Sequence, residues 1–137
     1  MQYLVSGKEM KLLDQNTSSK FHVPELVLME QAAMTFVRRL FFLQKKYHKE
    51  ISNALILCGS GNNGADGLAI ARLLMQDGLT SCVCLCGEAA GHKTTESYQT
   101  QKAICQAYQI RMEEQIPEEK SDLVIDALFG IGLSRNI

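Results

Sequence analysis

Two short polar segments carry most of the side chains in this sequence that could do chemistry. The first is Gly59-Ser60-Gly61-Asn62-Asn63-Gly64, which fits the pattern G-x-G-x-x-G and is closely followed by Asp66. Backbone N–H groups of a glycine-rich turn at a helix start favour phosphate, whereas amide and carboxylate oxygens suit a cation or sugar hydroxyls. The segment therefore predicts a nucleotide site with a metal ion beside it.

The glycine segment has other interpretations. An ordinary dinucleotide-binding turn would use Glu88, at the end of the next predicted strand, to bind a ribose. A Walker loop is excluded because no lysine and hydroxyl residue follow Gly64. A purely structural alternative is that Asp66 caps the helix, while Asn62 and Asn63 occupy left-handed turn positions.

The second segment is the apolar run VIDALF, which contains Asp126 and leads into Gly130. A carboxylate is costly to bury in such a run unless it is paired, hydrogen-bonded or bound to a cation. In an open parallel sheet, ligands bind at the carboxyl ends of the strands, and both polar segments follow predicted strands. We therefore expect Asp126 to face the turn that begins at Gly59. A structural aspartate bonded to neighbouring backbone is the alternative.

Apolar patterns predict the elements that position these segments. Short apolar runs predict strands over 54–58, 80–86 and 122–129, and a further short strand is expected around 110–112. Helical periodicity predicts helices over 8–18, 24–48, 66–78 and 93–108. This alternation is typical of an α/β protein with a Rossmann-like, open, mainly parallel sheet, here with helices on both faces and two leading helices.

The same periodicity predicts which helix residues face the core. In the three later helices these are Met29, Ala33, Phe36, Leu40 and Leu43; then Leu68, Ala71, Leu74 and Met75; then Tyr98, Ala103, Ile104 and Ala107.

Composition narrows the class of protein. A length of 137 residues fits one domain, and a net charge of −1 with mixed signs argues against a nucleic-acid surface or a polybasic membrane patch. No run of about 18 apolar residues predicts a membrane span. Five cysteines suit buried thiols in a reducing, cytoplasmic setting. Cys82, Cys84 and Cys86 alternate on one predicted strand face, as core residues rather than zinc ligands, whose spacing is wider.

Together, the two polar segments resemble the NAD(P)H-hydrate epimerase family, also called the YjeF amino-terminal domain. The matching segments are 62–67 with the LAIARLL that follows, 126–135, 10–14 and 23–33. Two motifs in this order, about 60 residues apart, are more specific than a lone glycine pattern. The likeness spans essentially the whole chain.

The resemblance implies interconversion of the two epimers at C6 of hydrated NADH or NADPH, a repair reaction. It implies a potassium ion held by Asn63 and Asp126, a homodimer, and a fused or separate ATP- or ADP-dependent dehydratase. The residues that it implies in substrate binding are Asn62, Asn63, Gly64, Ala65, Asp66, Gly130, Ile131, Gly132, Leu133, Ser134, Arg135 and Asn136.

Inversion at C6 requires either that the hydroxyl leaves and returns or that the ring opens and closes, and both routes need a carboxylate to carry a proton. Asp126 is one candidate, but the resemblance implies a second aspartate in a later strand as the main acid/base. The chain ends at Ile137, before that strand, and has Ala65 where the family commonly has glycine. We therefore expect residues 1–137 to form an incomplete domain with little or no activity alone. A dehydrogenase-type module and a non-catalytic scaffold of the same fold are the alternatives.

Overall fold

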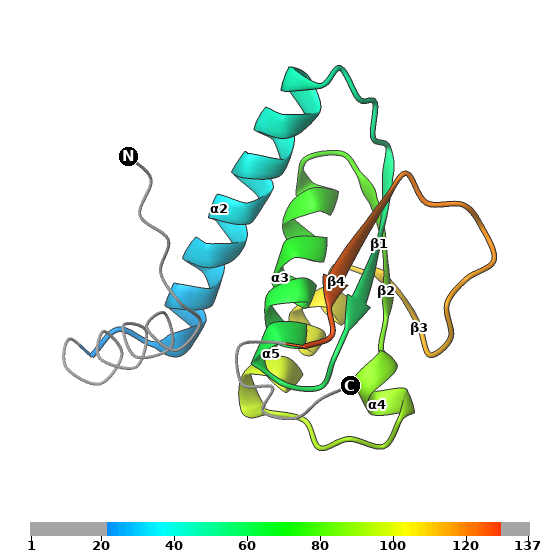
Figure 1. Cartoon of the computed structure of the whole chain (residues 1–137). Coiled ribbons are helices and arrows are strands. Elements are labelled where there is room, and N and C mark those ends of the chain that lie inside the picture. The colour runs from blue at the N-terminus through cyan, green and yellow to red at the C-terminus, as the bar shows by residue number, and fades with distance from the viewer. Residues whose placement is uncertain (1–21, 130–137) are drawn as a thin grey trace.

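The computed structural model describes residues 22–129 of the chain (Figure 1). The elements are α2 (Glu25–Lys46), β1 (Asn53–Cys58), α3 (Asn62–Gln76), β2 (Thr80–Cys84), α4 (Cys86–Ala89), α5 (Glu96–Ala107), β3 (Arg111–Glu113) and β4 (Leu123–Ala127). The strands form one four-stranded sheet in the order β3-β2-β1-β4, and every neighbouring pair is parallel. This confirms the predicted α/β fold. The first predicted helix, 8–18, lies outside the described residues.

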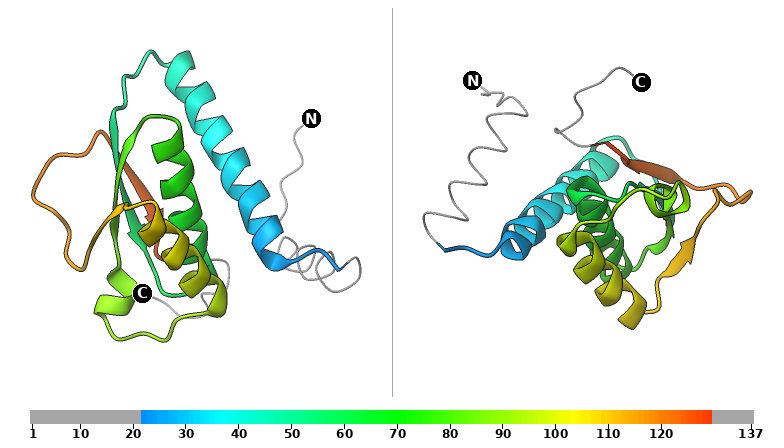
Figure 2. Two further views of the ribbon diagram at one scale, coloured as in Figure 1. Left: turned by 180° about the vertical axis from the view of Figure 1, so that it is seen from behind. Right: turned by 90° about the horizontal axis from the view of Figure 1, so that it is seen from below.

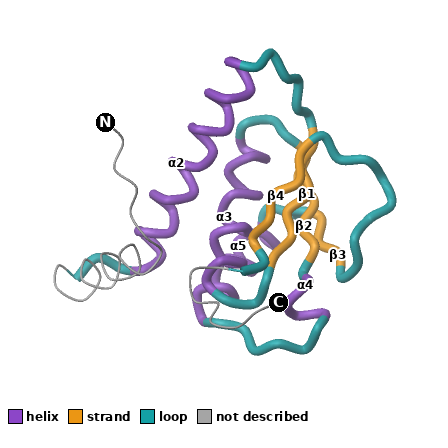
Figure 3. The backbone as a smooth tube through the Cα atoms, viewed as in Figure 1, coloured by secondary structure: helices purple, strands orange, loops and turns teal. Residues whose placement is uncertain are grey.

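Within the described residues, the three long helices lie on one face of the sheet rather than on both faces as predicted. Helix α3 packs between α2 and α5 and contacts β1, β2 and β4 (Figures 1 and 2). Right-handed crossovers place α3 and α5 on the same face, because β1, β2 and β3 follow one another in one direction across the sheet. The connection from β3 to β4 reverses that direction and is a loop without a helix (Figure 3).

The core lies between α3 and the sheet. Ile56, Cys58, Val83, Leu68 and Leu74 are each fully buried there. Burial of a large apolar side chain contributes about 1.5–3 kcal/mol, so this layer supplies much of the stability of the fold.

Helix α3 begins four residues earlier than predicted, at Asn62 rather than at 66. Gly64 was predicted in the loop but lies inside the helix, as Gly67 was predicted to do, and both glycines permit close packing. A Cβ atom on Gly67 would lie 2.7 Å from Ala127 Cβ and 2.9 Å from Cys58 Sγ. The helix therefore approaches β1 and β4 more closely than an alanine would permit.

Strand β2 ends at Cys84, and the predicted strand over 80–86 was too long. Cys86 instead begins α4, a single turn that packs on the glycine segment. A Cβ atom on Gly87 would lie 2.3 Å from the backbone nitrogen of Ser60. This tertiary contact explains why the chain turns at this point.

Several predictions of the inward-facing residues were wrong. In α2 the buried residues are Met29, Ala33 and Val37, and Phe36 is 41% exposed. Met75 of α3 is exposed as well. In α5, Tyr98 is buried as predicted, but Gln101 and Cys105 are buried in place of Ala103 and Ala107. The packing of each helix against α3, rather than its most hydrophobic stripe, sets its rotation.

Asp122 ties the start of β4 to the start of β1. Its Oδ2 accepts hydrogen bonds from the Ser52 N–H and hydroxyl, each at 2.9 Å, and from the Asn53 N–H at 3.3 Å. These bonds, chiefly those from Ser52, lower the pKa of Asp122. A lowered folded-state pKa stabilises the fold above the ordinary aspartate pKa of about 3.9, and this contribution is lost as pH falls through the lowered value.

We therefore expect Asp122→Ala to lower the urea midpoint of unfolding at pH 7, and to lower it less near the acid end of the titration. Urea titrations of both proteins across this pH range measure the difference. Glu118→Ala is the matched control, because Glu118 is an exposed carboxylate outside this group. An Asp122→Ala effect of the same size at every pH would contradict the assignment.

Candidate functional site

The glycine segment forms a tight turn between β1 and α3 at the carboxyl edge of the sheet. The Gly59 N–H donates to the Ala127 carbonyl at 2.9 Å, which extends the pairing of β1 with β4 into the turn. A Cβ atom on Gly64 would lie 1.8 Å from the Gly59 carbonyl oxygen. The first turn of α3 therefore rests directly on the backbone of the loop.

The structural alternatives for the polar residues of this segment are wrong. The N-cap of α3 is Gly61, so Asp66 lies one turn into the helix and does not cap it. Asn62 and Asn63 are helical, and neither is among the described non-glycine residues with positive φ. These residue types are therefore not explained by the turn alone.

The asparagine side chains make different contacts. Asn63 Nδ2 donates to the Phe129 carbonyl at 2.9 Å, so it joins the glycine segment to the chain that leaves β4. Among the described residues no hydrogen-bond partner is found for Asn63 Oδ1. Asn62 Nδ2 donates to Glu25 Oε1 at 2.8 Å, away from β4.

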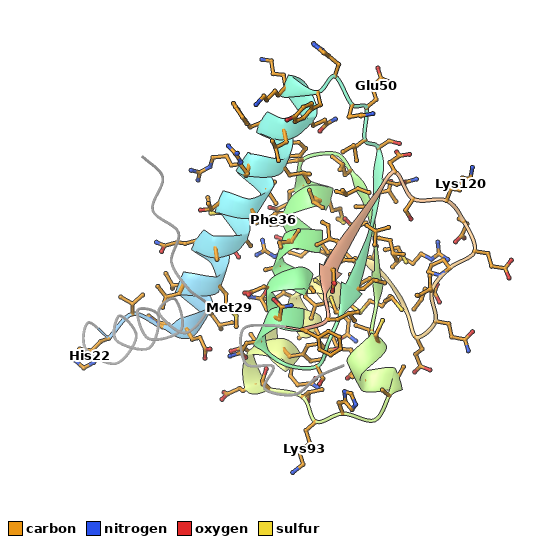
Figure 4. The ribbon with its side chains drawn as sticks, in the orientation of Figure 1. His22, Met29, Phe36, Glu50, Lys93 and Lys120 are labelled. Carbon is orange, nitrogen blue, oxygen red and sulfur yellow. The ribbon has the colours of Figure 1, made fainter. Side chains whose placement is uncertain are left out.

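Asn63, Asp66 and Asp126 line one cavity of about 240 Å³. Its other lining residues come from α2, α3 and β4, and they are Ala32, Ala33, Phe36, Gly67, Ile70, Ile125 and Ala127. Figure 4 shows Phe36 on the side of α2 that lies along α3. Ligand cavities commonly measure about 300–1,000 Å³, so this one would hold an ion and only part of a dinucleotide. Gly130 to Asn136, also predicted in the site, lie outside the described residues.

Asp126 is exposed. The free-energy cost of burying a carboxylate in an apolar strand, on which its prediction was based, therefore does not arise. Ile125 and Ala127 are buried, whereas Val124 and Asp126 alternate with them and are exposed on edge strand β4. Asp126 Oδ1 accepts from the Leu128 N–H at 3.0 Å, which is the local backbone bond of the structural alternative. The second carboxylate oxygen is not used in that bond.

Three residues of the cavity have side-chain oxygen atoms. Two of them carry a carboxylate and one carries an amide, and among the described lining residues none is basic. Hard oxygen ligands of this type suit potassium, magnesium or calcium rather than zinc. No group of three or more His, Cys, Asp or Glu side chains placed to bind a metal occurs in residues 22–129.

Ala65 fits its position without conflict. Its side chain is fully buried in the core, and its N–H donates to the Gly61 carbonyl at 3.0 Å. The methyl group of Ala65 therefore does not line the cavity.

Glu25 contacts the site, and the sequence analysis did not predict this. It begins α2, and besides Asn62 it accepts from Ser97 Oγ at 3.5 Å. Glu25 also places a negative charge in the first turn of α2, where it is favourable. Its 37-residue separation from Asn62 leaves no signal in the sequence spacing.

Glu88, the residue that would bind ribose in a dehydrogenase-type site, already has a partner. Its two carboxylate oxygens accept from Lys102 Nζ at 2.8 and 3.0 Å. This ion pair joins α4 to α5. A ribose at Glu88 would have to displace Lys102, which disfavours that alternative.

The parallel α/β sheet, with a glycine turn at its carboxyl edge, defines a Rossmann-like protein. Within residues 22–129, no helix has the length and hydrophobicity needed to cross a membrane. The family described as YjeF-related protein N-terminus matches residues 25–137, and the chain belongs to this family.

Named relatives agree with this assignment. The chain is 38% identical over 138 residues to an NAD(P)H-hydrate epimerase of Lentilactobacillus buchneri, covering 100% of this chain and 62% of that protein. It is 38% identical over 134 residues to one of Limosilactobacillus fermentum, covering 97% and 62%. A crystal structure of the yeast protein YNL200c has the same fold, with a TM-score of 0.76 at 24% identity over 99% of this chain and 60% of that one. The chain thus spans about three fifths of the length of these relatives.

Proposed function

We propose that this chain is the nucleotide- and ion-binding part of an NAD(P)H-hydrate epimerase, acting on hydrated NADH or NADPH. The observation that carries the proposal is the shared cavity of Asn63, Asp66 and Asp126, where the glycine turn meets the end of β4. Relatives that carry the name of this enzyme align with the whole chain, which supports the same conclusion.

A potassium ion is the second part of the proposal. Asn63 gives its amide nitrogen to Phe129, which leaves the amide oxygen as a ligand, and Asp126 keeps one carboxylate oxygen outside its backbone bond. The residues present therefore fit a hard cation. Such an ion would neutralise the carboxylates and attract the oxygen atoms of a substrate.

The start of α3 supports binding of the nucleotide. The first backbone bond within the helix runs from the Ala65 N–H to Gly61, so the preceding three N–H groups have no partner inside the helix. Such groups favour phosphate. We assign Asn62 to Asp66, and Gly130 to Asn136 beyond the described residues, to the hydrated dinucleotide.

Inversion at C6 moves a hydroxyl group and a proton, and a positioned carboxylate carries the proton in either route. Asp126 can serve through its second oxygen. We propose that the main acid/base belongs to the part of the relatives that this chain does not span, and that the chain alone has little activity.

The remaining parts of the proposal concern assembly and location. We propose a homodimer, an associated ATP- or ADP-dependent dehydratase and a cytoplasmic location. Five free thiols support a reducing setting.

Thermal unfolding in potassium and in sodium, with and without hydrated NADH, tests this function. A ligand that binds only the folded state raises apparent stability, so we expect hydrated NADH to raise the melting temperature more in potassium. Unhydrated NADH is the matched control for the ligand and is expected to have a smaller effect.

Three results would contradict parts of the proposal. Equal shifts in both salts would exclude a selective potassium site. A larger shift with ordinary NAD, independent of potassium, would favour a dehydrogenase-type module. Epimerisation at a rate near that of the longer relatives would show that the chain already holds the main acid/base.

A further inference from the structure

Two cysteines at the carboxyl end of β2 have their sulfur atoms in contact. The Cys86 thiol donates to Cys84 Sγ at 3.4 Å, with only Leu85 between the two residues. All five cysteines are free thiols, and this pair has the one sulfur–sulfur hydrogen bond found in residues 22–129. Neither cysteine lines the cavity described above.

The backbone at Leu85 brings these side chains together. Alternate residues of a strand share a face, and Leu85 has φ −85° and ψ 65°, the values of an inverse γ-turn, which shortens the distance across it. The turn is held from both sides, because the Leu85 N–H donates to the Glu113 carbonyl at 2.8 Å and its carbonyl accepts from the Ala89 N–H at 3.0 Å.

The geometry is near that of a disulfide. A disulfide requires sulfur atoms about 2.05 Å apart, so the contact of 3.4 Å must close by about 1.4 Å.

The two thiols differ in access to solvent. Cys84 is 1% exposed, and its burial, with a smaller effect of the neighbouring Cys86 thiol, raises its pKa to about 12. Cys86 is only half-buried. An oxidant from solution therefore meets Cys86 first, and Cys84 is the thiol already in position behind it.

We propose that Cys84 and Cys86 form a redox-active dithiol, which hydrogen peroxide converts into an intramolecular disulfide. The Cys86 sulfur attacks the peroxide, the O–O bond breaks, and Cys86 becomes a sulfenic acid while the hydroxide that leaves takes the thiol proton as water. The Cys84 sulfur then forms the S–S bond and displaces the sulfenic hydroxyl, which leaves with the Cys84 proton as a second water. Two thiols are oxidised and one peroxide is reduced.

This modification reaches the glycine turn through α4. The Gly87 backbone lies so close to the turn that a Cβ atom there would be 2.3 Å from Ser60 N. Cys86 is the chain neighbour of Gly87, which packs on Gly59 and Ser60. A shift of Cys86 toward Cys84 is therefore transmitted to this contact. We expect the disulfide form to differ from the reduced form in melting temperature, and dithiothreitol to reverse the difference.

Peptide mapping after treatment with hydrogen peroxide tests the proposal. After alkylation of the remaining thiols, trypsin releases residues 73–93, which contain Cys82, Cys84 and Cys86. We expect this peptide to lose two hydrogens, with Cys82 alkylated and Cys84 joined to Cys86, and dithiothreitol to restore all three thiols.

Variants identify the pair. Cys86→Ser is expected to abolish the disulfide, and Cys82→Ser, the matched control on the same strand, is expected to leave it unchanged. Cys84→Ser is expected to leave Cys86 as a sulfenic acid that dimedone traps. Linkage of Cys86 to Cys82 or Cys58, or alkylation of both Cys84 and Cys86 after peroxide, would overturn the proposal.

Discussion

Replacing Gly64 with alanine is expected to lower the free energy of unfolding by about 3 kcal/mol, the largest stability effect among the single changes considered. The added Cβ atom would lie 1.8 Å from the Gly59 carbonyl oxygen and 2.7 Å from its carbon. Both neighbours are backbone atoms, so no side chain can rotate to make room. The first turn of α3 and the loop must separate, and the cavity lined by Asn63 must open.

Urea unfolding followed by circular dichroism measures this effect. Gly61→Ala is the matched control, because a Cβ atom at Gly61 meets nothing within 4 Å. Gly61 is the N-cap of α3, and replacing an N-cap glycine with alanine is expected to lower the free energy of unfolding by less than about 1 kcal/mol. Equal stability of the two variants would show that the backbone contact at Gly64 is absent in solution.

Replacing Asp126 with asparagine is expected to abolish the stabilisation by potassium, which is the largest functional effect that we predict. The amide oxygen of asparagine can still accept from the Leu128 N–H, so the turn after β4 is preserved. The negative charge beside Asn63 and Asp66 is lost, and with it most of the attraction for a cation. Without potassium, the variant should unfold at a temperature close to that of the unmodified chain.

The readout is the difference in melting temperature between potassium and sodium salts at equal ionic strength. Val124→Asn is the matched control, because Val124 is exposed two residues earlier on the same face of β4. It should retain the full response. A potassium response that persists in Asp126→Asn would exclude Asp126 as a ligand and leave Asn63 and Asp66 as the remaining oxygen donors.

Glu25 extends the candidate site beyond the two polar motifs. It holds Asn62 through a hydrogen bond of 2.8 Å, and Asn62 occupies the first position of α3. Glu30 of the same helix pairs with Arg72 of α3. The leading helix α2 is therefore part of the framework that orients the glycine segment, although it lies outside the βαβ pattern.

Local sequence was sufficient to predict most of the elements. Three apolar runs and the short segment around 110–112 each became a parallel strand, and a strand that is buried by helices has a short, nearly continuous apolar sequence. The meeting of the two polar segments also followed from the sequence. Parallel strands place their carboxyl ends at one edge, so residues 63 and 126 had to lie near each other once both strands were recognised.

Helix boundaries and helix rotation could not be predicted in the same way. Gly64 was predicted in the loop, because glycine is unfavourable in a helix by about 1 kcal/mol. In the folded chain it lies in the first turn of α3 and permits a close approach to the Gly59 backbone that a Cβ atom would prevent. Val37 rather than Phe36 faces the core for a related reason, since α2 packs against α3 through a stripe of smaller residues.

The sequence by itself determined the succession of strands and helices along the chain, the glycine turn and the family. Only the tertiary structure decided which oxygen atoms remain available beside that turn, that Glu25 reaches Asn62, and that Cys84 and Cys86 touch. The physical reason is the separation along the chain over which each interaction acts. Propensity and periodicity act over a few neighbouring residues, whereas these contacts depend on where separate helices and strands come to rest against one another.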